Sequence, residues 1–161
     1  MSHPDPGGPP DTRPIVPGEI WENPVTRERA VLIEAPWSNP EGRAVAELTA
    51  LVGARVIGEH MHPALHERFR VEQGELTVLC NGRESVLRAG EQADIEPGVW
   101  HDWWNAGDVD AVVHFEVAPG ERFLHMIETL FGLAREGHVG KGGMPNPLQL
   151  ALFAREFSEI G

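Results

Sequence analysis

Cysteine is almost absent from this chain of 161 residues: Cys80 is the one example, so no disulfide can form within the molecule. It closes an apolar run, where a buried structural thiol is the expected role. Paired cysteines that could bind structural zinc are equally absent. Cysteine chemistry therefore gives no account of what the protein does.

Long hydrophobic segments are absent as well. The longest unbroken apolar run, residues 150–154, is far shorter than the ~20 residues with which a helix crosses a bilayer. No apolar stretch near the first residues resembles a secretory signal. We therefore expect a cytoplasmic protein that makes no contact with membranes.

Basic residues are few. Lysine and arginine number 13 against 25 aspartates and glutamates, which gives a formal net charge of −12. Nucleic acids and anionic membrane surfaces are bound through basic patches that neutralise phosphate groups. Neither is expected as a partner of this chain.

Glycine and proline, by contrast, are plentiful, with 18 and 14 residues. They mark many turns and therefore many short strands, and the length predicts one domain. Residues 1–18 are interpreted as a flexible tail, because the first part is rich in proline, glycine and aspartate and has little to bury. Residues 19–119 are expected to form a β-barrel, and residues 120–161 a helical extension.

Strands are predicted between residues 27 and 117. The last of them shows the cleanest alternation, with Ala111, Val113 and Phe115 on one face. Asn81-Gly82 between two strands is a strong hairpin signal. Successive short strands separated by turns are typical of a β-sandwich or β-barrel. The predicted strands are residues 29–35, 43–52, 68–73, 75–80, 84–87 and 110–117.

The period changes to that of a helix after residue 119. Apolar residues recur from Phe123 to Ala134 at helical spacing, and Gly137 can end this helix. A second helix is predicted over residues 148–157, which are apolar around most of the circumference. Such a helix must be covered by the barrel or by a second subunit. We therefore expect a homodimer in which the partner covers this helix or an exposed edge of the barrel.

Three histidines and a glutamate are spaced as a metal site requires. His60 and His62 point the same way in an extended strand, so both can reach one ion. Glu67 needs a turn to return to that face, and residues 63–65, which begin with proline, can supply it. His101 is a fourth candidate donor. Imidazole and carboxylate together suit iron, manganese, nickel, cobalt, copper or zinc better than calcium.

These residues belong to two longer motifs, Gly53-x6-His60-x-His62-x4-Glu67-x6-Gly74 and Gly90-x7-Gly98-x2-His101-x3-Asn105. The pair closely resembles the paired motifs of the cupin superfamily. The departures are small: Gly53 is one residue further from His60 than in the family, and Glu96 replaces a proline. The resemblance implies a mainly β fold, a double-stranded β-helix or jelly-roll barrel. It also implies one divalent transition metal per chain, held by His60, His62, Glu67 and His101.

The wall of the barrel offers further candidates. By strand parity Trp103 shares the face of His101, while Phe69 and Val71 share that of Glu67, so these three are candidate pocket walls. Packing in the core explains the same residues without a ligand. His114 and Glu116 share a face of the last strand and are candidates for an acid/base pair, with a solvated outer face as the alternative.

The reaction is left open by the resemblance, because cupins include dioxygenases, isomerases, decarboxylases, cyclases, storage proteins and sugar-binding regulators. Motifs of other catalytic classes, such as Gly-x-Ser-x-Gly, are missing from the sequence. The leading hypothesis is a metal-dependent enzyme for a small oxygenated metabolite, aromatic or enolisable, with an oxygenase favoured over an isomerase or cyclase. The alternative is a non-catalytic module that binds or senses a small ligand.

Overall fold

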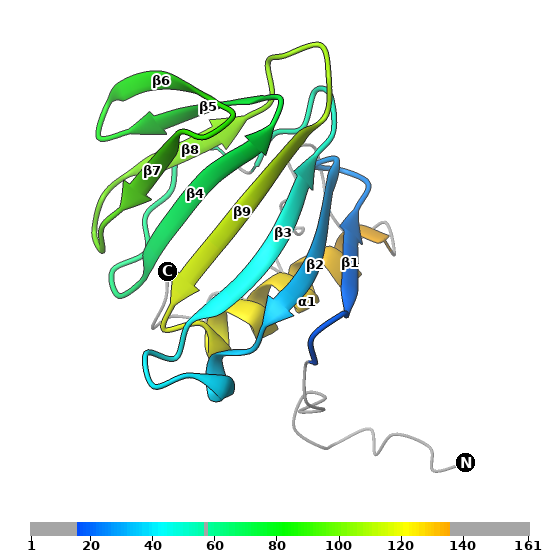
Figure 1. Cartoon of the computed structure of the whole chain (residues 1–161), viewed down its shortest axis with the longest axis vertical. Helices are drawn as coiled ribbons and strands as arrows, with labels where there is room; N and C mark the ends of the chain where they lie inside the picture. The colour runs from blue at the N-terminus through cyan, green and yellow to red at the C-terminus, as the bar shows by residue number, and fades with distance from the viewer. Residues whose placement is uncertain (1–15, 57, 136–161) are drawn as a thin grey trace.

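Two antiparallel sheets enclose one hydrophobic core in the computed structural model, which describes residues 16–56 and 58–135 (Figure 1). The larger sheet has the strand order β1-β2-β3-β9-β4-β7, and the smaller has the order β6-β5-β8. The strands are β1 (Ile20–Asn23), β2 (Glu28–Glu34), β3 (Ala44–Ala50), β4 (His66–Gln73), β5 (Glu75–Cys80), β6 (Arg83–Arg88), β7 (Gln92–Ile95), β8 (His101–Trp104) and β9 (Ala111–Ala118). A short 3-10 helix, η1 (Pro36–Ser38), follows β2.

The predicted fold class, a mainly β jelly-roll barrel, is confirmed. Each of the six predicted strands is present, with ends that differ from the prediction by two residues or fewer. The alternation in β9 reflects burial as expected: Ala111, Val113 and Val117 are almost fully buried, because this face of the larger sheet lines the core. Hydrophobic period alone therefore identified the strands that carry most of the core.

The hairpin predicted at Asn81-Gly82 is also confirmed. Asn81 and Gly82 have φ angles of 51° and 76°, and the flanking residues Cys80 and Arg83 pair across the turn. Both central residues of a type I′ turn need positive φ, which asparagine and glycine tolerate best. This turn fixes the register of β5 and β6 in the smaller sheet.

Three strands were not predicted from the sequence: β1, β7 and β8, each of four residues. Their brevity gives too few alternations for a period to be read. β8 nevertheless matters most for the site, because it begins at His101 and pairs with β5.

One helix, α1 (Glu121–Arg135), follows β9 and passes behind β1, β2 and β3 in Figure 1. Phe123 and Met126 of its predicted apolar stripe are buried, and so is Leu124, which the stripe did not include. No helix among the described residues is long and apolar enough to cross a membrane. The predicted helix over residues 148–157 lies outside the described residues, as do Gly137 and most of the predicted tail. The domain boundaries therefore stay predictions.

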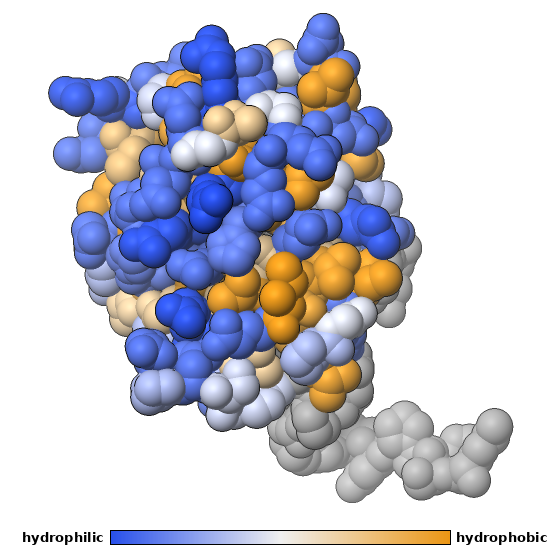
Figure 2. Space-filling model, viewed as in Figure 1, coloured by the Kyte–Doolittle hydropathy of each residue, from blue (hydrophilic) through white to orange (hydrophobic). Residues whose placement is uncertain are grey.

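The outer face of the larger sheet is mostly polar, but apolar side chains gather over its β1–β2 edge (Figure 2). Ile20 is 48% exposed and Ile33 is 50% exposed. Ile20 pairs with Val31, which shares a face of β2 with Ile33. These three residues, Ile20, Val31 and Ile33, are called the edge patch below.

Candidate metal centre

Three histidines converge in the structure as the sequence predicts. The ligand atoms of His60, His62 and His101 all lie within 4.8 Å of one another. The backbones of His60 and His101 form an isolated antiparallel bridge, with both N–O distances at 2.8 Å. The carbonyl of His62 accepts a hydrogen bond of 2.9 Å from the amide of Gly98. Backbone pairing therefore joins the two motifs and sets the histidines side by side.

The tautomers of two imidazoles are fixed by the backbone. Nδ1 of His60 lies 2.7 Å from the carbonyl oxygen of Gly58, and Nδ1 of His101 lies 2.9 Å from that of Val99. A carbonyl oxygen can only accept, so each Nδ1 must carry the hydrogen. The lone pair of each neutral ring is then on Nε2, the arrangement in which protein histidines bind metals.

Glu67 joins the cluster from the second residue of β4. Its Oε2 lies 2.9 Å from Nε2 of His101, and its Oε1 lies 3.6 Å from Nε2 of His62. Nε2 of His101 and Oε2 of Glu67 are buried, and neither has a hydrogen bond of acceptable geometry to any of the residues that the structure describes. Buried polar atoms without a partner are rare, and a cation between these donors would satisfy both. The three histidines therefore form a group that could hold a metal ion, and Glu67 lies beside two of them as a candidate fourth donor.

The electrostatics of the cluster suit a positive charge at its centre. Burial lowers the pKa of His60 to about 4, so this ring is neutral near pH 7 and able to act as a ligand. Burial acts against protonation of His101, but Glu67, together with the Val99 carbonyl and Asp102, outweighs burial and raises the pKa of this ring. The carboxylate thus favours a cation beside His101.

The cluster opens on a cavity of about 130 Å³ that is lined mainly by the larger sheet and α1, with Trp103 from the smaller sheet. Its walls are mainly apolar, and α1 closes one side. The ring of Phe123 on this helix stands edge-on to that of His62, with centroids 6.0 Å apart. The walls include Ala30, Leu48, Val56, Phe69, Trp103 and Phe115.

The predicted pocket walls divide into two groups. Phe69 and Trp103 line the cavity, with ring centroids 6.4 Å apart. Val71 is fully buried in the core and is not a wall residue. Trp104 faces the other way, and the guanidinium of Arg55 lies 4.8 Å from its ring centroid. The strand parity assumed around His101 agrees with this arrangement.

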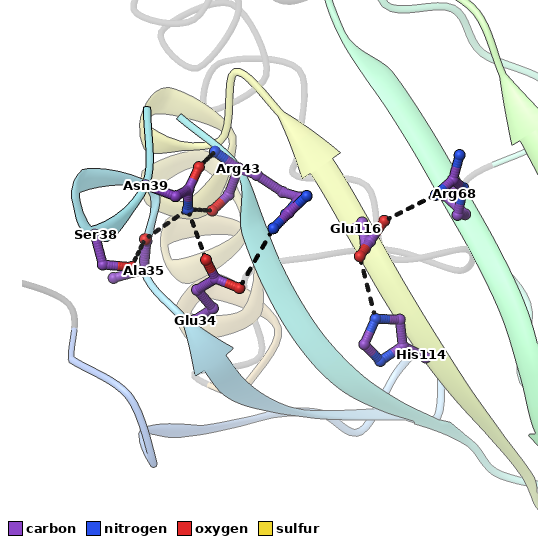
Figure 3. Close-up of polar contacts among 8 residues, drawn as sticks. All are labelled: Glu34, Ala35, Ser38, Asn39, Arg43, Arg68, His114 and Glu116. Atoms are coloured by element: carbon purple, nitrogen blue, oxygen red, sulfur yellow. Dashed lines mark hydrogen bonds and ion pairs between the residues drawn. The ribbon is translucent and has the colours of Figure 1, made fainter. Parts of the chain in front are cut away.

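His114 and Glu116 are not brought to the cavity. They lie on the outer face of the larger sheet, with His114 Nε2 3.3 Å from Glu116 Oε1 (Figure 3). Glu116 also lies 3.5 Å from Arg68, which contacts Asp94 at 2.7 Å. β9 directs Phe115 into the cavity, so the residues on either side must point outward. The geometry matches the outer-face alternative and gives no support to an acid/base pair at the histidines.

Three polar residues that line the cavity were not predicted from the sequence: Trp21, Thr26 and Glu28. Burial raises the pKa of Glu28 to about 7, and the Thr26 hydroxyl partly opposes this shift. One signal was available, because Glu28 shares the parity of the apolar residues Ala30 and Leu32 in β2. An acid in register with an apolar face points to the interior.

The fold and this donor set define a class of protein: a small double-sheet β-barrel with an imidazole and carboxylate cluster at the wall of an apolar cavity. The chain belongs to the cupin superfamily. The family model described as "Cupin domain" matches residues 47–118, which include all four residues of the cluster.

Curated relatives extend the similarity. An oxidoreductase of Pestalotiopsis fici, iacF, is 30% identical over 149 residues, which are 84% of this chain and 72% of that protein. The tetracenomycin polyketide synthase protein TcmJ of Streptomyces glaucescens is 31% identical, over 56% of this chain and 54% of its own. An oxidoreductase of Arthrobotrys oligospora is 28% identical, over 52% of this chain and 38% of its own. The chain thus spans only part of the length of these relatives.

Solved structures agree on the fold. An RmlC-like cupin from Shewanella frigidimarina superposes with a TM-score of 0.55 at 19% identity, over 66% of this chain and 88% of that one. KdgF from a Halomonas species also gives 0.55, at 16% identity, over 65% of this chain and 89% of that one. Identities this low establish the fold alone.

Proposed function

We propose that the protein binds one divalent transition metal ion per chain and acts as an oxidoreductase on a small oxygenated compound, aromatic or enolisable. The observation that carries this proposal is the cluster itself. Its three imidazoles lie together, and in His60 and His101 the backbone leaves Nε2 for a metal. Glu67 would be the fourth ligand, from its place beside His101.

The donor set supports the choice of metal. Three imidazoles and a carboxylate suit iron, manganese, cobalt, nickel, copper or zinc. A bound ion of this kind supplies Lewis acidity and, where it is redox-active, electron transfer. The apolar cavity beside the cluster would hold the substrate and exclude water, with Phe69 and Trp103 against a flat ring. Two relatives whose names are "oxidoreductase" support the reaction class.

One observation favours a second candidate function, a non-catalytic module that binds a small ligand. His114 and Glu116, the acid/base candidates, lie on the outer face and do not line the cavity. In that case the metal would help to bind the ligand without turning it over.

Metal analysis of full-length protein, purified without a histidine tag, tests the first step. We expect about one transition metal per chain in the wild type and none in the double variant His60→Ala/His101→Ala. His114→Ala is the matched control and should keep its metal, because this histidine lies outside the cavity. A wild type without metal, or a double variant that keeps it, would refute the proposal.

Oxygen consumption with a panel of phenols and diketones tests the second step. Turnover in the wild type and in His114→Ala, with loss in the double variant, supports the oxidoreductase. A metal-loaded wild type that binds these compounds without consuming oxygen would identify the second candidate instead.

A further inference from the structure

The cavity has a second polar end, which is remote from the histidines. Trp21, Thr26 and Glu28 line it from β1, β2 and the turn between them. Glu28 pairs with Ala50, and Ala50 pairs with Ala111 at the start of β9. Glu67 pairs with Val117, near the end of β9. The two polar ends therefore lie at opposite ends of the larger sheet and on different sides of β3 and β9.

The donors at this end are poorly satisfied by the part of the chain that the structure describes. Trp21 Nε1 is buried and forms no hydrogen bond among the described residues, and the buried Thr26 Oγ1 has no neighbour there besides the Glu28 carboxyl group, whose pKa it lowers. Oδ1 of Asn23 accepts hydrogen bonds of 3.0 and 3.1 Å from the amides of Val25 and Thr26, which holds the turn in place. Leaving buried polar groups unpaired is costly, so groups fixed in this state indicate a partner that binds from the cavity.

Glu28 completes this end of the cavity. Its side chain is almost enclosed, and no ion pair joins it to a cation among the described residues. A carboxyl group in such surroundings needs more hydrogen-bond partners than the Thr26 hydroxyl alone. Together the three residues present an indole N–H donor, a hydroxyl group and a carboxyl group on the wall of one cavity.

Only apolar surface separates the two ends. Leu48, Val56 and Phe115 lie between them with the rings of Phe69 and Trp103. A ligand that filled the cavity would therefore have a flat apolar body. It would need polar atoms at its two extremities and none along its edges.

We propose that Trp21, Thr26 and Glu28 form a second ligand subsite, which binds a hydroxyl group on a ring whose opposite end faces the histidine cluster. The indole N–H donates to the hydroxyl oxygen, and the hydroxyl hydrogen is donated to Glu28. The proposal rests on the proposed function only in placing the other end of the ligand at the metal. It narrows the substrate class to rings that carry oxygen at two distant positions.

The test uses two probes of nearly equal shape, 4-methylphenol and 1,4-dimethylbenzene, which differ by a hydroxyl in place of a methyl group. Their dissociation constants are measured by calorimetry on full-length protein as purified. We expect the wild type to prefer 4-methylphenol by about tenfold, the difference that one good hydrogen bond in a buried site makes. Glu28→Leu should lose this preference and bind the hydrocarbon as well as before.

Two further variants separate hydrogen bonding from a general effect on folding. Glu28→Gln keeps an acceptor in the same shape and should retain most of the preference. Trp21→Phe keeps a ring but removes the N–H donor and should reduce the preference. Glu22→Leu, at an exposed acid on β1, is the matched control and should behave as the wild type. Equal affinity for the two probes in the wild type, or the same preference in Glu28→Leu, would overturn the subsite.

Metal content is measured on the same preparations. Wild-type protein that binds metal but shows no hydroxyl preference would overturn the subsite alone. Protein that shows the preference but binds no metal would overturn the proposed function alone.

Discussion

Asn105 shows that not every residue of the paired motifs serves the metal. Its Nδ2 donates hydrogen bonds of 2.9 Å to the carbonyls of Ala50 and Val109, and its Oδ1 accepts one of 2.9 Å from the amide of Gly107. The polar atoms of the side chain thus form hydrogen bonds that hold the loop after β8 against β3. The same motif contains His101, the first residue of β8. One short sequence therefore supplies a histidine of the cluster and the hydrogen bonds that hold the neighbouring loop.

Glu28 should make the stability of the fold depend on pH. Its pKa is about 7 in the folded protein against about 4.5 as its ordinary value, so the folded state holds the proton more tightly. The wild type therefore loses stability as pH rises from 4.5 to 7 and carries the full penalty above that range, which for such a shift is about 3 kcal/mol. Glu28→Gln should remove the penalty.

Chemical denaturation of the wild type and Glu28→Gln at two pH values measures this effect. We expect the variant to be more stable at pH 8, by up to about 3 kcal/mol, and the two proteins to be nearly equal at pH 4. Because the wild type and Glu28→Gln share all their other titratable groups, the difference in stability between them at one pH reports on Glu28 alone. A gap that is the same at both pH values would show that Glu28 does not titrate as its burial implies.

Trp103 and Trp104 allow a matched comparison of the two faces of β8. Trp103 is 5% exposed and lines the cavity, whereas Trp104 contacts Arg55 on the other side. Trp103→Ala should cost about 3–5 kcal/mol of unfolding free energy and weaken the binding of 4-methylphenol. Trp104→Ala should cost less and leave the affinity unchanged. The opposite outcome for binding would mean that the strand parity around His101 is wrong.

At the scale of elements, local spacing was enough for the histidine cluster but not for the far end of the cavity. His60 and His62 are two residues apart, and the motifs around them are long, so the sequence could place them. Trp21 reaches the cavity only because β1 adds to the edge of the larger sheet beside β2, whereas Glu28 could have been recognised from its parity with Ala30. Such pairings depend on tertiary contacts, and β1 is too short to be read from its period.

The turn between β4 and β5 depends on Gly74. Its φ is +74°, and a Cβ there would lie 2.8 Å from the carbonyl oxygen of Asp110 and 3.1 Å from Cα of Ala111. Both are backbone atoms held in β9 or next to it, so neither can move without disturbing the sheet. The motif glycine is explained by this close approach as well as by its backbone angle.

Gly74→Ala should therefore destabilise the protein more than Gly90→Ala. Gly90 has a φ of +90°, but a methyl group added there would meet nothing within 4 Å, so this position isolates the cost of the backbone angle. That cost is about 1–2 kcal/mol, and the clash at Gly74 should add about 1–3 kcal/mol. Urea denaturation of both variants gives the comparison, and equal losses would rule out the clash.

At the scale of the whole molecule, the edge patch remains to be covered. Ile20 and Ile33 are each about half exposed, on the outer face of β1 and β2. β1 is also the last strand of the larger sheet, so its outer edge has unpaired backbone groups within the described structure. Proteins seldom leave an apolar edge strand open to water, because it can pair with other chains.

We expect a homodimer that buries this patch. Sedimentation velocity at micromolar concentration should show a dimer for the wild type and a monomer for the double variant Ile20→Asp/Ile33→Asp, because two buried charges on each side would face each other across a symmetric contact. Val86→Asp is a control, since Val86 is also exposed, at 38%, but lies on β6 in the other sheet. A wild type that sediments only as a monomer would reject the dimer. A dimer that survives the double variant would move the contact to another surface.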